Sequence, residues 1–268
     1  MLLSVYWNPS PVAFHLGPIA IQWYGLMWGA GLMVVFFIGQ YVMRALNKDD
    51  DKLTILIQYV FLFGLLGARL VHIIFYQLDY YLANPVKILA VWEGGLASHG
   101  GVIGGLVGIY VFCMRNKEFN LLWVTDMSAV VTLALASLIR FGNLMNSEIV
   151  GKVTGSDYGF IFPEYGMEPR HPTVLYESIA YMLLQGVLLL LFTKYKDRKP
   201  GLYSAVFLIA VFGIRFLLEF TKEPDGAIFF NAISKTQMLN VPFIVAGLVM
   251  LFLSLKHKLR YPSKAQHG

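Results

Sequence analysis

Hydrophobic residues fall into seven long blocks along this chain, and short polar stretches separate the blocks. Each block has about 20 residues, the length that a helix needs to cross the hydrocarbon core of a bilayer. The pattern therefore predicts an all-α protein that crosses a membrane about seven times, as a single membrane-embedded domain over residues 1–268. The expected spans are Ile19–Tyr41, Leu53–Tyr76, Leu96–Met114, Leu121–Phe141, Thr173–Lys194, Leu202–Phe220 and Gln237–Leu255.

The first and third blocks have special features. We do not expect the first block to be a cleaved signal peptide, because no Lys or Arg precedes it and it exceeds the apolar region of a signal. The third block is interrupted by His99 and by five glycines, among them Gly100 and Gly101. Glycines at such positions allow two helices to pack closely in a membrane, which is their simplest explanation.

Composition and charge indicate a membrane protein with a defined orientation. Hydrophobic residues make up 57% of the chain and charged residues only 14%, and the mean hydropathy is +0.62. Of the 21 Lys and Arg residues, 13 fall in the loops and tail on one side and 5 on the other. Because Lys and Arg are enriched on the cytoplasmic side, we expect the N-terminus outside and the C-terminus in the cytoplasm. This bias explains the net charge of +5, which therefore does not indicate a nucleic-acid partner.

Three arginines lie inside the hydrophobic blocks, namely Arg69, Arg140 and Arg215. A charge at membrane depth is costly and rare, so it indicates function by default. Each arginine lies in the last part of a span that is expected to run from inside to outside. All three are therefore expected toward the outer leaflet, where a long cationic side chain can also simply reach the headgroups. Three arginines at one depth favour a pocket for an anionic group.

Other polar residues are expected at the depth of these arginines. Asn143 follows Arg140 by three residues and so shares its helical face, and Glu148 lies just beyond. Glu219 follows Arg215 by four residues, a spacing that permits an ion pair. Such a pair either orients the guanidinium or merely neutralises it.

Polar segments between the spans are expected to form a small external head. Residues 147–172 contain six charged residues and four aromatic ones, which is too polar for a segment in lipid. The stretch His171–Glu177 then opens the fifth span, where Pro172 suits a helix start. His99 opens the third span, either as a functional group or as a packed histidine.

Several motifs together carry a family resemblance. Over nearly its whole length the chain resembles the bacterial prolipoprotein diacylglyceryl transferases, and Arg140–Glu148 is the most specific of the matching pieces. The matching pieces are Trp23–Gly25, Gly67–Arg69, Gly94–Gly101, Arg140–Glu148, His171–Glu177, Arg215–Glu219 and Glu223–Asp225. Members of that family often carry arginine near Lys222; lysine keeps the charge but not the forked geometry.

The resemblance implies a reaction at the bacterial cytoplasmic (inner) membrane. Enzymes of this family move diacylglycerol from phosphatidylglycerol to the thiol of the lipobox cysteine of a prolipoprotein. A thioether forms and glycerol-1-phosphate leaves. The expected partners are thus phosphatidylglycerol and the signal peptide of a prolipoprotein, and neither a cofactor nor a metal is expected.

The arginines suit this chemistry, because the leaving group is a phosphate ester. Arginine matches phosphate geometry and supplies positive charge where negative charge develops. We therefore expect Arg140 and Arg215 to be catalytic and to bind phosphatidylglycerol, with Arg69 as a third candidate. Tyr24 is also expected to be catalytic, as a group that hydrogen-bonds the glycerol or phosphate oxygens, and Asn143 is expected to bind the donor in the same way. The other expected site residues are Glu148 and Glu219 as groups that orient the arginines, and Gly100 and Gly101 in the donor site.

The nucleophile is expected to come from the substrate. Cys113 is the one cysteine of the chain, and it falls near the cytoplasmic end of the third span. A substrate thiol with a pKa of about 8.5 is mostly protonated at neutral pH, so a base or a stabiliser of the thiolate is needed. His99 is the candidate base, and the arginines are the alternative stabilisers.

Two other classes of membrane protein are alternatives. A transporter of anionic lipids is expected to contain internal repeats, and the sequence contains none. An intramembrane protease needs a serine-nucleophile motif, a His-Glu-x-x-His motif or paired intramembrane aspartates, and the sequence contains none of these.

Overall fold

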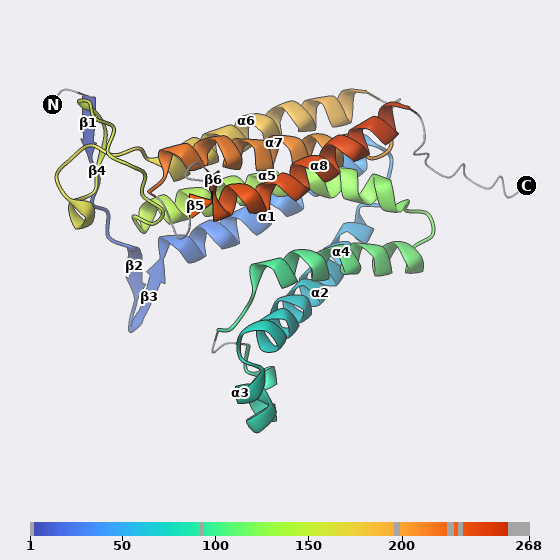
Figure 1. Cartoon of the computed structure of the whole chain (residues 1–268). Coiled ribbons are helices and arrows are strands. Elements are labelled where there is room, and N and C mark those ends of the chain that lie inside the picture. The colour runs from blue at the N-terminus through green and yellow to red at the C-terminus, as the bar shows by residue number, and fades with distance from the viewer. Residues whose placement is uncertain (1–2, 92–93, 196–198, 224–227, 230–232, 257–268) are drawn as a thin grey trace, which may run out of the picture. The chain divides into compact units, whose positions relative to one another are not determined.

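The structure is a computed structural model that describes residues 3–91, 94–195, 199–223, 228–229 and 233–256. Most of these residues are helical (Figure 1). The α-helices are α1 Trp23–Ala45, α2 Asp51–Tyr76, α3 Leu78–Ala83, α4 Ser98–Arg115, α5 Leu121–Met145, α6 Thr173–Lys194, α7 Leu202–Leu218 and α8 Lys235–Leu255. Three short 3-10 helices are η1 Pro85–Leu89, η3 Pro163–Tyr165 and η4 Glu219–Thr221.

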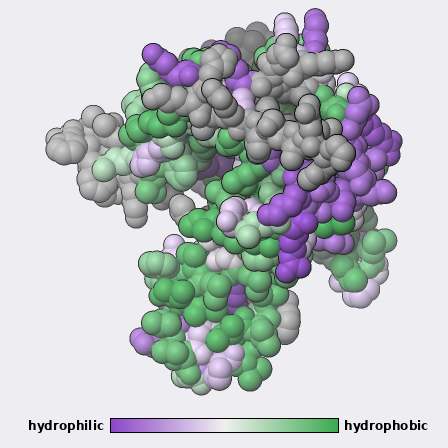
Figure 2. Space-filling view, turned by 90° about the vertical axis from the view of Figure 1, so that its right-hand side faces the viewer, coloured by the Kyte–Doolittle hydropathy of each residue, from purple (hydrophilic) through white to green (hydrophobic). Residues whose placement is uncertain are grey.

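Six helices of the described chain are long and apolar enough to cross a membrane, which confirms the expected all-α polytopic class. They are α1, α2, α5, α6, the segment from α7 through η4, and α8. The expected third span corresponds to α4, whose apolar part Gly100–Arg115 is shorter. Hydrophobic side chains accordingly cover much of the visible surface (Figure 2).

The expected start of the first span was wrong by several residues. Ile19–Gln22 forms strand β3, which pairs antiparallel with β2 Val12–Leu16, and α1 begins only at Trp23. The turn between these strands contains Gly17 with a φ of +59°, a conformation that favours glycine. Both strands are apolar, so hydropathy alone merged β3 with the helix that follows.

Two further strand pairs lie in the part of the chain that the structure describes. Strand β1 Leu3–Tyr6 pairs in parallel with β4 Tyr158–Ile161, so the N-terminal segment joins the expected head. The short strands β5 Ile228–Phe229 and β6 Ile233–Ser234 form an antiparallel pair just before α8.

The chain divides into two compact units, which we describe separately. Within the described residues, one unit contains residues 3–38 and 126–256, and the other contains residues 39–125. The first unit contains most of α1 and α5 together with α6, α7 and α8. The second unit contains α2, α3 and α4.

Glycines hold α2 and α4 of the second unit in close contact. A Cβ atom on Gly67 would overlap the carbonyl oxygen of Gly100, and one on Gly104 would overlap the carbonyl oxygen of Phe63. By contrast, a Cβ on Gly101 would stand 3.8 Å from its nearest neighbours, an ordinary contact. The close packing that the glycines predict is therefore present.

Polar side chains hold the helices of the first unit together. The Gln185 side chain on α6 accepts a hydrogen bond from the backbone of Ala134 on α5 at 2.8 Å. Asp126 of α5 accepts hydrogen bonds from the backbone N–H groups of Gly201 and Ser204 at 2.7 and 2.8 Å. This buried carboxylate thus caps the start of α7, where unpaired N–H groups favour an anion.

Candidate active site

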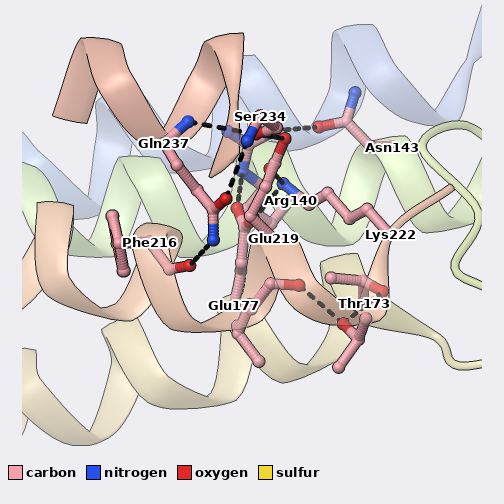
Figure 3. A network of polar contacts seen from close by, with 11 residues as sticks. Arg140, Asn143, Thr173, Glu177, Phe216, Glu219, Lys222, Ser234 and Gln237 are labelled. Atoms are coloured by element: carbon pink, nitrogen blue, oxygen red, sulfur yellow. Dashed lines mark hydrogen bonds and ion pairs between the residues drawn. The ribbon is translucent and has the colours of Figure 1, made fainter. Parts of the chain in front are cut away.

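Arg140 lies at the centre of a polar network in the first unit (Figure 3). Its Nε atom is 2.5 Å from Glu177 Oε2 on α6. Its Nη1 atom donates a hydrogen bond to Asn143 Oδ1 at 3.2 Å, as the shared helical face predicts. Arg140 is therefore held from two sides, and its side chain is 17% exposed.

Asn143 connects Arg140 to Glu148. The Asn143 amide donates to Glu148 Oε2 at 2.7 Å, and the Glu148 backbone N–H donates to the Asn143 carbonyl at 2.9 Å. Asn146 adds a second side-chain hydrogen bond to Glu148 at 3.1 Å. Glu148 thus acts on Arg140 through Asn143, which supports the orienting role expected for this glutamate.

Glu177 is a residue of this network for which the sequence motifs predict no role. Its side chain is completely buried, and its Oε1 atom is 2.8 Å from Lys222 Nζ. Both contacts of its carboxylate are close ion pairs without the alignment of hydrogen bonds. A signal was available in the sequence, because Thr173, Glu177 and Tyr181 follow one another at helical spacing on the buried face of α6.

Glu219 has partners other than the expected one. Its Oε2 atom is 3.4 Å from Lys222 Nζ, and its Oε1 atom accepts a hydrogen bond from Ser234 Oγ at 3.0 Å. The described residues contain no ion pair between Glu219 and Arg215, although their spacing permits one. Ser234 also caps α8 in a capping box with Gln237, so Glu219 is linked to the start of that helix.

Arg215 has a buried donor atom that makes no hydrogen bond to the described residues. This atom is Nε, and it is buried within the described part of the chain. Tyr181 interacts electrostatically with Arg215, Arg140 and Glu177, which indicates that Arg215 lies near the network. A buried guanidinium donor without a partner is costly, so a bound anion would stabilise Arg215.

Tyr24 lies against the segment that contains Arg140 and Asn143. A Cβ atom on Gly142 would stand 3.1 Å from Tyr24 Cδ2 and 3.3 Å from Met27 Cβ, so α1 and α5 are in close contact at this glycine. Glycine at position 142 therefore allows the close approach of α1 that brings Tyr24 to the site.

The expected external head is a folded structure that also holds Lys222. Gly151 and Lys222 form an antiparallel bridge, and the Lys152 backbone N–H donates to the Thr221 carbonyl at 2.8 Å. Trp7 Nε1 donates to the Leu144 carbonyl at 2.9 Å, which ties the segment after β1 to the end of α5. The head has a small apolar core of Leu144, Val150, Phe162 and Val174.

Arg69 belongs to the second unit, where backbone carbonyl groups accept hydrogen bonds from its guanidinium group. Its five N–H donors are matched by five hydrogen bonds of 2.5–3.2 Å, and only 5% of the residue is exposed. The acceptors are the backbone carbonyls of Lys87, Ile88, Ala90, Gly94 and Gly95. Arg69 also lies over the Tyr81 ring, at 4.8 Å from its centroid. Arg69 therefore organises the segment between α2 and α4, and a role in binding lipid stays a prediction.

The remaining expected residues also belong to the second unit. The side chain of His99 lies outside the described residues; its backbone is in the first turn of α4. The segment before this turn is attached to α2 by a hydrogen bond from Ala97 N–H to the Ala68 carbonyl at 3.0 Å. Gly100 and Gly101 lie on the face of α4 that packs against α2.

Comparison with known proteins decides the family. The family model of prolipoprotein diacylglyceryl transferases matches residues 11–253. The chain belongs to the prolipoprotein diacylglyceryl transferase family. The resemblance that the motifs indicate is thereby confirmed, and the apolar helices make the protein a multi-pass membrane protein.

Three relatives, each named phosphatidylglycerol–prolipoprotein diacylglyceryl transferase, illustrate how far the similarity extends. The protein of Tolumonas auensis is 41% identical over 257 residues, which cover 96% of this chain and 100% of the relative. The protein of Chloroherpeton thalassium is 40% identical, with 94% of this chain and 95% of the relative covered. The protein of Bacteroides fragilis is also 40% identical, with 96% and 98% covered. The similarity therefore includes both units of the chain.

Proposed function

We propose that this protein transfers the diacylglyceryl group of phosphatidylglycerol to the lipobox cysteine of prolipoproteins. The thiol sulfur attacks the carbon of the diacylglyceryl group that carries the phosphate. The bond between this carbon and the phosphate oxygen breaks, and glycerol-1-phosphate leaves as the thioether forms. The observation that carries the proposal is the full-length similarity to relatives with this name, together with the Arg140 network at the end of apolar helices.

Arg140 and Arg215 are proposed to bind the phosphate and to stabilise the charge that develops on it. Glu177 and Asn143 engage the Nε and Nη1 atoms of Arg140. The buried Nε atom of Arg215 has no hydrogen-bond partner among the residues that the structure describes. Fixed donors in a site of low dielectric stabilise developing charge without reorganisation. Asn143 and Tyr24 are proposed to hydrogen-bond the glycerol or phosphate oxygens.

The thiol proton needs an acceptor, and His99 is our candidate. The nucleophile itself is proposed to belong to the substrate, because Cys113, the one cysteine of the chain, lies near the end of α4 that is expected on the cytoplasmic side. A neutral imidazole accepts a proton near neutral pH. If His99 is not the base, the arginines are the remaining group that favours the thiolate.

The site is proposed to face the outer leaflet of the bacterial inner membrane. The distribution of Lys and Arg supports this orientation, because it puts the C-terminal ends of α5 and α7 on the side with few basic residues. Arg140 and Arg215 both lie near those ends. The donor is a lipid of that leaflet, and the lipobox peptide reaches it after export.

One observation argues against the alternative of a lipid transporter. Such a protein needs polar groups toward the inner side as well, and Asp126 is the clear intramembrane candidate there. Its carboxylate caps the start of α7, so its position has a structural explanation.

The proposal is tested with purified protein in detergent micelles that contain phosphatidylglycerol and a lipobox peptide. We expect the peptide to gain the mass of one diacylglyceryl group, and a peptide with serine in place of the lipobox cysteine to gain none. Folded protein that gives no mass gain on the cysteine peptide would refute the proposed function.

A further inference from the structure

We infer that Glu177 is a positioning residue for the transfer reaction, because one buried carboxylate holds both Arg140 and Lys222. Its Oε2 atom is 2.5 Å from Arg140 Nε and its Oε1 atom is 2.8 Å from Lys222 Nζ. The inference rests on the proposed function and extends the same site. Arg140 comes from α5, whereas Lys222 follows η4, so Glu177 links cations that are distant in the sequence (Figure 3).

The burial of Glu177 explains why these contacts are specific. A carboxylate with no exposed surface is costly unless cations compensate it. In the described structure Arg140 and Lys222 are the cations that contact it. Glu177 is therefore the carboxylate that both cations share.

The contact with Arg140 also selects which donors face a ligand. Glu177 engages Nε, the donor nearest the side-chain stem, and Asn143 engages Nη1. The Nη groups carry four of the five guanidinium N–H donors. Holding Arg140 by Nε thus leaves most of its donors for a phosphate group and fixes the direction in which they point.

Lys222 pairs with two carboxylates, those of Glu177 and Glu219. Glu219 Oε2 is 3.4 Å from its Nζ atom, and the bridge to Gly151 holds its backbone. Lys222 is 11% exposed at the side chain, so its charge is largely desolvated. Glu177 and Glu219 thus pair directly with Arg140 and Lys222, whereas the described residues contain no ion pair of Arg215.

The test is Glu177→Gln, which keeps the shape of the side chain and removes its charge. We expect kcat to fall by about a hundredfold, because a misplacement of about 1 Å near the chemistry costs this much. KM for phosphatidylglycerol is expected to change by less than about threefold, since all three cations remain to attract the lipid and the loss falls on the transition state.

Asp126→Asn is the matched control. Asp126 is also a completely buried carboxylate of the first unit. It lies on α5, 14 positions before Arg140, and it caps the start of α7, whereas Arg215 lies near the end of that helix. We expect this variant to lose thermal stability and to keep kcat per folded molecule. If Glu177→Gln instead loses folded protein and activity in parallel, as this control does, its role is structural and the inference is wrong.

A second pair of variants tests the inference if Glu177→Gln does not fold. Glu177→Asp keeps the charge but is one methylene shorter, so it reaches one cation at a time, and we expect kcat to fall by roughly tenfold. Adding Lys222→Arg lengthens the partner and is expected to restore part of this loss. A shortened carboxylate with the kcat of the parent protein would overturn the inference.

The parent protein in the same assay separates the two claims. An inactive parent protein would contradict the proposed function. An active parent together with an equally active, folded Glu177→Gln variant would contradict only the role of Glu177.

Discussion

Ser137 of α5 and Ser178 of α6 each donate a hydrogen bond to the backbone carbonyl of the other, at 2.8 and 2.9 Å. Both serines are buried, and their hydroxyl oxygens are 3.0 Å apart. Ser137 lies three residues before Arg140, and Ser178 directly follows Glu177. The two hydrogen bonds therefore fix the register of α5 against α6 at the level where the arginine meets the glutamate.

The first prediction concerns this serine pair. We expect the double variant Ser137→Ala/Ser178→Ala to lower the free energy of unfolding by roughly 1–3 kcal/mol, because each interhelical hydrogen bond in a membrane contributes about 0.6–1.7 kcal/mol. Thermal unfolding in detergent measures the loss. Thr193→Val is the control on α6, since the Thr193 hydroxyl bonds within its own helix, to the Leu189 carbonyl; an equal loss in this variant would contradict the prediction.

The second prediction concerns the two arginines proposed to bind phosphate. We expect Arg140→Ala and Arg215→Ala to lower the transfer rate by on the order of a thousandfold, because each removes charge stabilisation in the transition state. Arg140→Lys should also be poor, since lysine lacks the forked guanidinium. Initial rates on a lipobox peptide check this. Arg44→Ala is the control, as Arg44 is exposed and pairs with Asp50; near-normal turnover in either alanine variant at position 140 or 215 would refute the assignment.

The sequence predicts the membrane class and much of the Arg140 site, for local physical reasons. Apolar blocks of helical length must become helices in a bilayer, and i,i+3 spacing places Asn143 beside Arg140 on one helix. The glycines of α4 similarly indicate the close contact with α2 that the structure contains. Each of these features depends on residues that are near one another in the chain.

The features that the sequence does not predict depend on residues that are distant in the chain. Glu177 meets Lys222 across 45 positions, and Glu219 meets Ser234 across 15. The spacing of Arg215 and Glu219 permits a pair on one helix, but η4 replaces the last turn of α7 at Glu219 and the carboxylate contacts Lys222. Spacing along one helix cannot rank such competing partners.

The third prediction separates Arg69 from the other two arginines. We expect Arg69→Gln to lower the free energy of unfolding by roughly 2–4 kcal/mol, since several buried backbone carbonyls lose their charged donor. Limited proteolysis between residues 78 and 95 should accelerate in this variant, because Arg69 binds carbonyls along this segment. Arg140→Gln is the comparison, and it should leave this segment as resistant as in the parent protein. A stable, protease-resistant Arg69→Gln variant with a raised KM for phosphatidylglycerol would instead favour direct binding of lipid by Arg69.

The last prediction separates the two roles of His99. If His99 is the general base, His99→Gln should lower the rate strongly at neutral pH. The loss should shrink as the pH rises toward the pKa of the substrate thiol, about 8.5, because the substrate then ionises without help. If His99 only shapes the site, the loss should be similar at every pH.

Initial rates of both proteins between about pH 6 and pH 9, at saturating phosphatidylglycerol, distinguish these roles because the thiol ionises over this range. A parallel series with Arg140→Lys serves as the control, since its loss arises from geometry and should not follow the ionisation of the thiol. A ratio of His99→Gln to parent rates that rises toward alkaline pH supports the base. A ratio that stays constant rules against His99 as the base. Arg140 and Arg215 are then the groups that stabilise the thiolate, because their positive charge lowers the free energy of an anion bound between them.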